Sequence, residues 1–417
     1  MIELQTGAGV RQRAELTFRF NREAGRHGWL RLTPAYSLRL VRDILKRQDA
    51  GIRVLDPFSG TGTTPLCAAE RGDRGTGIEI NPFLVWLSRA KLAHYSPRII
   101  AECRVALEHI VASLESGQIE AAPPPALYNI SRWWSARDLS CLCQLRAAIG
   151  RYSEGQGADL LLVAFCRQMI ELSNAAFNHQ SMSFKDASTQ DALPAAQGML
   201  FDLPSHAEAF GSQVESVLRS AQDNPTGQGS IVLGDARWPS KHLDSTFDLL
   251  ITSPPYPNRI SYIRELRPYM YWLGYLRDGR DAGELDWSTT GGTWGIATSR
   301  LAAWEPPTDA FQPAYLQDAV QRIRQSDNKS SALLANYVAK YFADMWEHIR
   351  NVGTAMAYGA ELHYIVGNSS FYGVLVPVER VYLDMLQEAG FRNGSISVLR
   401  KRNSKKELYE FDVSARK

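Results

Sequence analysis

The residue types best suited to chemistry lie in two short motifs, and the first is a glycine-rich turn. It reads DPFSGTGTT over Asp56–Thr64, directly after an apolar run. Glycines let backbone N–H groups approach a ligand closely, and Gly60 and Gly62 stand where such a turn needs them. Glu79 ends the next apolar stretch, and its carboxylate could accept both hydroxyls of a ribose. The pattern predicts a site for an adenosyl cofactor. A nicotinamide enzyme is disfavoured, because the Gly-x-Gly-x-x-Gly spacing is missing.

The second motif, TSPPY over Thr252–Tyr256, also ends an apolar run. The exocyclic amine of a base is a poor nucleophile, because its lone pair is delocalised into the ring. Ser253 offers a hydroxyl oxygen and Pro254 a carbonyl that Pro255 holds rigid, so both amine hydrogens could be accepted here. Tyr256 offers a ring that can stack on a base flipped out of its helix. The motif therefore predicts a base pocket in which these four residues are catalytic.

The two motifs together resemble those of the S-adenosylmethionine-dependent amino-methyltransferases of DNA. The resemblance covers five segments: His27–Leu45 is similar to motif X, Asp56–Thr64 to motif I, Glu79–Pro82 to motif II, Gly234–Ala236 to motif III and Thr252–Tyr256 to motif IV. It implies S-adenosylmethionine as the cofactor, held by Thr33, Asp56, Phe58, Ser59, Gly60, Gly62, Thr63, Thr64, Glu79, Ile80, Asp235 and Ala236. The methyl group would pass in line to the amine nitrogen, without a covalent enzyme intermediate.

The residue before Pro-Pro-Tyr bears on which base the resembling enzymes methylate. Serine there is usual for cytosine N4, and Asp or Asn for adenine N6, so Ser253 favours cytosine N4. Adenine N6 stays open as the alternative, and so does an RNA base. RNA enzymes with similar motifs usually carry Asp at this position and an added N-terminal domain, whereas the motif X segment begins here at His27. A binding protein that has lost catalysis is disfavoured, because Gly60, Glu79 and Tyr256 are intact.

Further substrate contacts are expected from three residues outside these motifs. Arg264 and Arg267 follow motif IV and could contact phosphates, or could be ordinary surface charges. Asn368 follows a later apolar strand, where the resemblance implies a residue that lines the base pocket, and capping the turn is the alternative. The basic run Arg400–Lys406 could likewise bind phosphates or form a solvated hairpin.

Alternating strand and helix patterns predict an α/β fold: a Rossmann-like doubly wound methyltransferase sheet with a largely helical insertion. Strands are expected near 53–56, 75–80, 231–236, 247–252 and 362–366, and helices near 36–46, 64–70, 82–94, 132–182, 337–350 and 378–388, before a final hairpin. The segments 1–98 and 229–417 would form the cofactor-binding and catalytic halves. The stretch 186–229 is expected to be polar and partly mobile.

Target recognition is expected in one of two insertions. The first is the mainly helical segment 99–228, in which residues of the types that read base edges occur together: Asn178, His179, Gln180 and Ser183. The second is the segment 275–330, which is expected to be irregular because it is rich in Gly, Thr and Trp.

The bulk composition is that of a globular protein: 417 residues, 45% hydrophobic, 22% charged and a net charge of +2. This is too weakly basic for charge alone to argue for nucleic acid. Neither a basic start followed by an apolar stretch nor a membrane-spanning apolar run is visible, so a soluble cytoplasmic protein is expected. The five cysteines are expected to be reduced thiols without zinc spacing, so no metal is expected. The expected partner is duplex DNA with a flipped base, and a restriction nuclease would have to be a separate chain.

Overall fold

The computed structural model describes residues 10–32, 36–117, 119–152, 155–176, 183–184, 205–293, 295–402 and 407–417. Several residues with predicted roles lie outside these ranges, namely Thr33, Asn178, His179, Gln180, Lys405 and Lys406. The predicted helix start at Thr33–Pro34 also lies outside, and the first α-helix described begins at Leu38 after Ser37.

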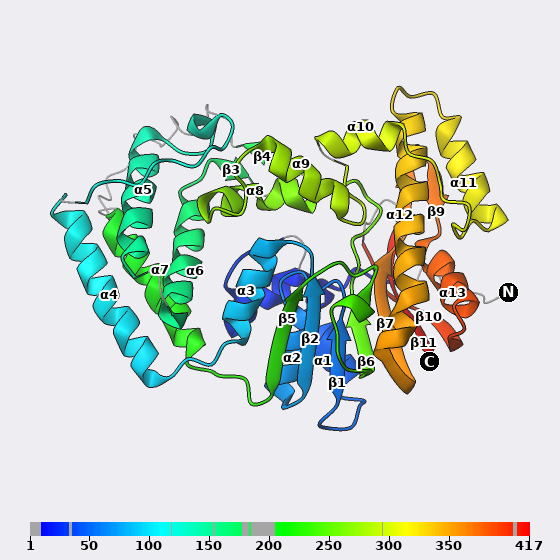
Figure 1. Ribbon diagram of the computed structural model, residues 1–417, viewed down its shortest axis with the longest axis horizontal. Helices are drawn as coiled ribbons and strands as arrows, with labels where there is room; N and C mark the ends of the chain where they lie inside the picture. Colours follow the sequence, from blue (N-terminus) through cyan, green and yellow to red (C-terminus); the bar gives the residue numbers. More distant parts are fainter. Residues whose placement is uncertain are drawn as a thin grey trace.

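A seven-stranded sheet of described residues forms the centre of the protein (Figure 1). From edge to edge its strands are β5 (Gln228–Leu233), β2 (Arg74–Glu79), β1 (Arg53–Asp56), β6 (Phe247–Thr252), β7 (Met356–Gly367), β11 (Tyr409–Arg416) and β10 (Arg392–Lys401). The pairs from β5 to β7 are parallel, whereas β11 runs antiparallel to both of its neighbours. The chain thus winds outward from β1 in two directions, which confirms the predicted doubly wound α/β fold.

Helices cover both faces of the sheet because neighbouring strand residues point to opposite sides. On one face, Val54 and Leu249 pack with α1 (Leu38–Leu45) and α2 (Thr63–Arg71). On the other, Leu55 and Leu250 pack with α12 (Ser331–Val352) and α13 (Val378–Glu388). Strands buried on both faces read as continuous apolar runs, which is why β6 was easy to predict.

A second, mainly helical body lies beside the sheet (left in Figure 1) and shares one hydrophobic core with α3 (Pro82–Leu92). Its helices are α4 (Pro97–Glu115), α5 (Ala136–Gly150), α6 (Gln156–Glu171), α7 (His206–Ala221) and α8 (Tyr262–Trp272). Helix α7 lies in the stretch that was expected to be polar and mobile. A capping box between Ser205 and Glu208 starts this helix, and apolar residues at helical spacing, among them Phe210 and Val214, bury its inner face.

The segment 275–330 is helical rather than irregular. It forms α9 (Gly279–Ser288), α10 (Ile296–Ala302) and α11 (Ala314–Arg324). Asp278 caps α9, and α11 buries Leu316, Ala319 and Ile323 at helical spacing. Gly279 and Gly283 lie within α9 and Thr298 within α10, whereas most of the other glycines and threonines lie in the connections. This composition hid the short helices.

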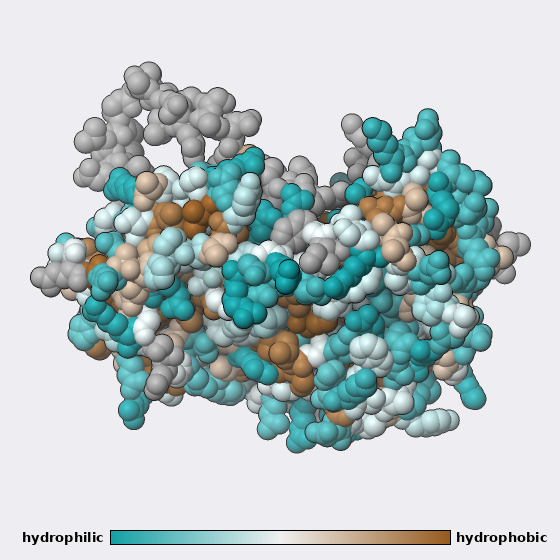
Figure 2. Space-filling model, turned by 45° about the horizontal axis from the view of Figure 1, so that its top comes forward, coloured by the Kyte–Doolittle hydropathy of each residue, from teal (hydrophilic) through white to brown (hydrophobic). Residues whose placement is uncertain are grey.

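The remaining described elements are short. They are the 3-10 helices η1 (Ala14–Leu16), η2 (Phe18–Glu23), η3 (Gly25–Gly28), η4 (Ile130–Arg132), η6 (Pro239–Lys241) and η7 (Gly353–Ala355), and the strand pairs β3 (Ala175–Ala176) with β4 (Ser183–Phe184) and β8 (Ser369–Phe371) with β9 (Val374–Val376). On the face that Figure 2 shows, hydrophilic residues predominate and hydrophobic ones gather in small separate patches. Among the described helices, none has the length and apolar character needed to cross a membrane.

Candidate active site

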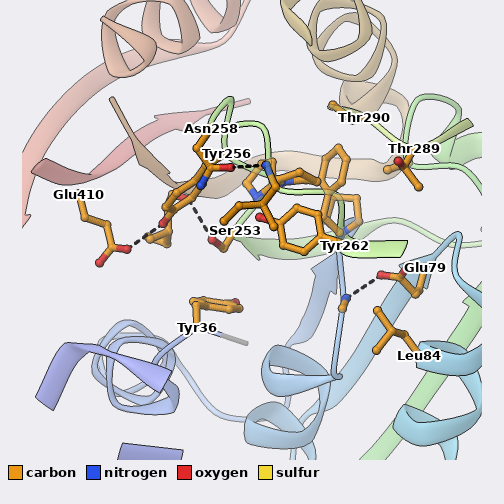
Figure 3. Close-up of a pocket in the computed structure, with 18 of the residues that line it drawn as sticks. Tyr36, Glu79, Leu84, Ser253, Tyr256, Asn258, Tyr262, Thr289, Thr290 and Glu410 are labelled. Atoms are coloured by element: carbon orange, nitrogen blue, oxygen red, sulfur yellow. Dashed lines mark hydrogen bonds between the residues drawn. The ribbon is translucent and has the colours of Figure 1, made fainter. Parts of the chain in front are cut away.

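A cavity of about 810 Å³ lies at the edge of the sheet where the parallel strands end. Residues that follow or end four of these strands line it: Phe58 and Gly60 after β1, Glu79 and Ile80 at the end of β2, Asp235 and Ala236 after β5, and Ser253, Pro254, Pro255 and Tyr256 after β6. Doubly wound folds bind ligands at this edge, because the loops that connect strands to helices meet there. Figure 3 shows Ser253, Tyr256 and Tyr262 on one side of the cavity and Glu79 and Leu84 on another.

Glu79 is fixed at the cavity wall by the glycine loop. Its Oε2 accepts the backbone N–H of Gly60, and its Oε1 accepts that of Asn81, both at 2.8 Å. Gly60 has a left-handed φ of +51°, a conformation in which other residues are strained. Burial raises the pKa of Glu79 to about 7. Each carboxylate oxygen keeps a lone pair, so the two together can still hold a pair of hydroxyl groups.

Asp56 joins the two motifs and does not itself line the cavity. It is fully buried, and its Oδ1 accepts hydrogen bonds from Thr252 Oγ1 at 2.6 Å and from the Phe58 N–H at 3.2 Å. Burial raises the pKa of the Asp56 carboxyl to about 6. Because β1 and β6 pair side by side, this contact fixes the glycine loop relative to the TSPPY motif.

Four other predicted cofactor residues are buried behind the loop and do not line the cavity: Ser59, Gly62, Thr63 and Thr64. Thr64 Oγ1 donates to the Ile251 carbonyl at 3.2 Å and also bonds with the Tyr36 hydroxyl. Gly62 has a φ of +76°, and a β-carbon there would lie 2.8 Å from Ser88 Oγ. These residues shape the turn from behind.

The TSPPY residues form the other wall. Ser253 Oγ donates a hydrogen bond to the Ile365 carbonyl at 3.2 Å, which leaves its lone pairs to accept. The Tyr256 hydroxyl donates to Glu410 Oε1 at 2.8 Å, and burial raises the pKa of that hydroxyl. Glu410 also accepts hydrogen bonds from Nε and Nη2 of Arg400, at 2.7 and 3.1 Å. A buried acid that no sequence motif indicated therefore holds the tyrosine ring in place.

His348 on α12 supports two lining residues from behind. Its Nδ1 donates to the Ala236 carbonyl at 2.6 Å, its Nε2 accepts from the Tyr364 hydroxyl at 2.8 Å, and its ring meets that of Phe58 edge-on at 4.9 Å. Burial lowers the pKa of His348 to about 4, so the imidazole is neutral at neutral pH. Sequence reasoning missed this residue.

We expect His348→Leu to lower the free energy of unfolding by about 2–4 kcal/mol, because it leaves the Ala236 carbonyl and the Tyr364 hydroxyl buried without their partner. Tyr364→Phe leaves only His348 Nε2 without its partner and should cost less, about 1–2 kcal/mol. Urea unfolding of the two variants beside the wild type measures both values. Equal stability of His348→Leu and wild type would contradict the supporting role.

Asp235 is anchored by a charged network. Arg237 Nη2 donates to Asp235 Oδ2 at 2.6 Å, and Arg237 Nη1 donates to Asp344 Oδ1 at 3.1 Å. Lys340 Nζ completes the network with a 2.6 Å contact to Asp344 Oδ2. Arg237 was also missed, although a guanidinium two residues after the motif III acid could have indicated it. The network fixes the Asp235 carboxylate at the cavity wall.

The cavity fits S-adenosylmethionine. Its volume of about 810 Å³ lies within the ~300–1,000 Å³ typical of small-molecule sites. The Glu79 carboxylate suits the two ribose hydroxyls, and the Asp235 carboxylate can accept from an adenine amine. Phe58, Ile80 and Ala236 give the intervening wall an apolar surface suited to a purine ring.

No family model matches the sequence. The chain is 21% identical to Type II methyltransferase M.BsoBI of Geobacillus stearothermophilus, over 95% of this chain and 85% of that protein. It is 20% identical to Type II methyltransferase M.MvaI of Kocuria varians, over 81% of this chain and 74% of that protein. Among solved structures, TrmN from Thermus thermophilus aligns at 10% identity over 95% of this chain and 53% of its own, with a TM-score of 0.34 that is too low to carry an argument.

The chain is a methyltransferase, and its methyl donor is S-adenosylmethionine.

The N-terminal segment of the methyltransferase closes one side of the cavity. Its lining residues are Gln12, Arg13, Ala14, Leu16 and Thr17. Two hydrogen bonds attach this segment to the rest of the protein. The backbone N–H of Lys401 donates to the Arg11 carbonyl at 3.2 Å, and Ser37 Oγ donates to the Glu15 carbonyl at 3.1 Å. Sequence reasoning placed none of these residues at the site, because the segment shows only a polar and basic composition.

The methyltransferase does not bring the three predicted substrate contacts together in this cavity. Arg264 lines a neighbouring cavity. The guanidinium of Arg267 lies 5.1 Å from the ring centroid of Trp133, and burial lowers its pKa. Asn368 is 3% exposed and bonds backbone groups, among them the Tyr409 N–H at 2.8 Å. These backbone contacts favour the alternative in which Asn368 holds the turn after β7 and does not line the base pocket.

The two described arginines of the basic run face the cavity, whereas Lys401 pairs with the exposed Glu407. Arg400 pairs with Glu410 and lines the cavity. Arg402 also lines it, with its guanidinium 5.3 Å from the ring centroid of Tyr256 and its Nε donating to the Tyr409 carbonyl at 3.1 Å. Both arginines therefore belong to the wall of the cavity and not to a solvated surface.

Proposed function

We propose that this methyltransferase is a site-specific DNA methyltransferase that modifies the exocyclic N4 amine of cytosine. The single observation that carries the proposal is that Ser253 and Glu79 line one cavity. An acceptor for a base amine then faces the same space as the carboxylate suited to the ribose of the methyl donor. The relatives named as Type II methyltransferases support the DNA methyltransferase part of this proposal.

The chemistry requires the amine nitrogen to become more nucleophilic and to be aligned. S-Adenosylmethionine supplies an electrophilic methyl group when bound. In this proposal Ser253 Oγ and the Pro254 carbonyl accept the two amine hydrogens, which draws the nitrogen toward tetrahedral geometry and localises its lone pair for attack. Tyr256 holds the flipped base by stacking, while Glu410 and Arg400 hold Tyr256. Fixing both reactants in one cavity lowers the barrier by positioning.

The choice of cytosine over adenine rests on the groups that face the rest of the base edge. Beside its amine, cytosine presents two acceptors, N3 and O2, whereas adenine presents one acceptor, N1, and a carbon-bound hydrogen. Arg402 lies at the cavity wall beside Tyr256, with its Nε and Nη2 donating to the Tyr409 and Asn368 carbonyls. In this proposal its Nη1 hydrogens complement the acceptors of the cytosine edge. Serine at position 253, usual for cytosine N4 in the resembling enzymes, points the same way.

We expect Arg402→Lys to lower kcat/KM on DNA about tenfold or more, because lysine keeps the charge but loses the planar donor fork. S-Adenosylmethionine affinity should stay unchanged. Arg392→Lys, on the edge strand β10, is the matched control and should behave as wild type. Steady-state methylation of a substrate duplex measures the effect, and full activity of Arg402→Lys would contradict a role in holding the base.

The proposal is tested by supplying purified protein with labelled S-adenosylmethionine and equal masses of genomic DNA and total cellular RNA. We expect the label to appear in the DNA and to be released by deoxyribonuclease. Label that enters only RNA would overturn the assignment to DNA.

A further inference from the structure

A second cavity, of about 530 Å³, lies beside the first and shares Asn258 and Ile260 with it. Its wall consists mostly of polar and charged residues: Asn258, Arg259, Ser261, Arg264, Glu265, Thr293, Ser370 and Tyr372. No predicted role accounts for this space, apart from the proposed phosphate contact of Arg264. The first residue of its wall, Asn258, follows Tyr256 by two positions, so one short loop separates the second cavity from the base pocket.

The conformation of Arg259 directs this loop into the second cavity. Arg259 has a φ of +64°, a left-handed value that is uncommon for residues other than glycine, asparagine and aspartate. Its backbone N–H donates to the Tyr337 hydroxyl at 3.1 Å, which holds the strained turn in place. Strain of this kind persists only where the surroundings enforce it, and it clusters at ligand sites. The Arg259 side chain is exposed and lines the second cavity, not the first.

Arg264 brings a second guanidinium to the same wall. Helix α8 carries it, and its backbone N–H is fixed by Ser261 Oγ at 3.1 Å. Glu265 is the one carboxylate among the lining residues, so the two arginines leave the wall net positive. Tyr372, at the β8–β9 turn, also lines the cavity; it has a φ of +50°, and its hydroxyl donates to Asn328 Oδ1 at 2.9 Å. The cavity is therefore polar and basic.

We propose that this second cavity binds the backbone phosphodiester next to the flipped nucleotide, with Arg259 and Arg264 as its donors. The inference rests on the proposed function. The loop 256–261 would then hold one nucleotide at two points, with Tyr256 against the base and Arg259 on the phosphate. A nucleotide fixed at both ends has little freedom to rotate, so the amine meets Ser253 in a defined orientation. Guanidinium groups suit this task because their planar forks match phosphate oxygens.

The test uses a duplex that contains the mapped methylation site and the variants Arg259→Ala, Arg259→Gly and Arg259→Lys. We expect Arg259→Ala to weaken duplex binding about tenfold or more and to reduce the slope of log K against log salt by about 0.9, the value for one lost phosphate contact. Arg259→Gly should lose as much affinity although it relieves the backbone strain, whereas Arg259→Lys should keep the salt slope. Arg74→Ala is the control, because Arg74 begins β2 and so lies at the end of the strands away from both cavities.

A neutral methylphosphonate placed on either side of the target nucleotide identifies the phosphate. One of the two replacements should weaken binding by the wild type and cause no further loss in Arg259→Ala. An unchanged salt slope in Arg259→Ala and Arg259→Gly would overturn the inference while the wild type still methylates DNA. So would a methylphosphonate that weakens binding of Arg259→Ala as much as it weakens binding of the wild type. A wild type that transfers no methyl group to DNA would instead overturn the proposed function and this inference with it.

Discussion

Replacing Ser253 with alanine is expected to slow methyl transfer about 100-fold or more and to leave S-adenosylmethionine affinity within about twofold. One preorganised hydrogen-bonding group removed from a reacting centre typically costs this much. Ser253 lines the cavity, where its hydroxyl bonds the Ile365 carbonyl and interacts with the Tyr256 hydroxyl. Neither partner belongs to the glycine loop, so the removal of this hydroxyl leaves the loop and Glu79 untouched. The loss should therefore appear in the transfer step and not in cofactor binding.

Single-turnover transfer of labelled methyl groups to DNA measures the rate, and calorimetry measures cofactor binding. Ser230→Ala is the matched control, because Ser230 lies on the edge strand β5 and bonds the Thr76 hydroxyl at 3.1 Å, away from the cavity. Its rate should equal that of the wild type. A Ser253→Ala protein that transfers methyl groups at the wild-type rate would rule out the proposed role of this hydroxyl.

The second large effect is expected at Glu79, whose loss should weaken S-adenosylmethionine binding about 100-fold for Glu79→Ala. The carboxylate is the only group at the cavity wall for which we propose contacts to both ribose hydroxyls, and a charged hydrogen bond is worth about 1.5–3 kcal/mol. Gly60 and Asn81 also lose their hydrogen-bond acceptor. Glu102→Gln, on the exposed surface of α4, serves as the control.

The pH dependence of binding separates charge from shape at Glu79. Its pKa of about 7 is raised by burial, and donors from a ribose favour the ionised form. Affinity should therefore be highest above pH 7 and fall as the pH drops through 7 and the carboxylate takes up a proton. Glu79→Gln should bind weakly with a flatter profile between about pH 6 and 8. A wild-type affinity that does not change over this interval would contradict ribose recognition by the ionised carboxylate.

Much of the sheet could be predicted because its central strands are buried on both faces. Val54 and Leu55 face opposite layers of helices, so the strand appears in the sequence as an apolar run. The edge strand β5 was predicted at 231–236 but lies at Gln228–Leu233. Its first three residues are polar or glycine and mostly half-exposed or exposed, as an edge strand allows, so hydrophobicity alone did not reveal where it starts.

The candidate site divides in the same way into local and long-range parts. Residues of contiguous motifs, such as Phe58, Glu79 and Ser253, line the cavity as their motifs indicated. Glu410 and His348 were not predicted, because they reach the site through contacts between strands and helices far apart in the chain. Pairings of this kind depend on the assembled sheet, and no spacing in the sequence encodes them.

The most direct test of the central claim is to identify the methylated nucleoside. Genomic DNA is treated with the purified protein and S-adenosylmethionine and then digested to nucleosides. The nucleosides are separated by chromatography and identified by mass spectrometry. The pocket formed by Ser253, Tyr256 and Arg402 predicts N4-methyldeoxycytidine, absent when Ser253→Ala replaces the wild type. N6-methyldeoxyadenosine as the sole product would contradict the assignment to cytosine.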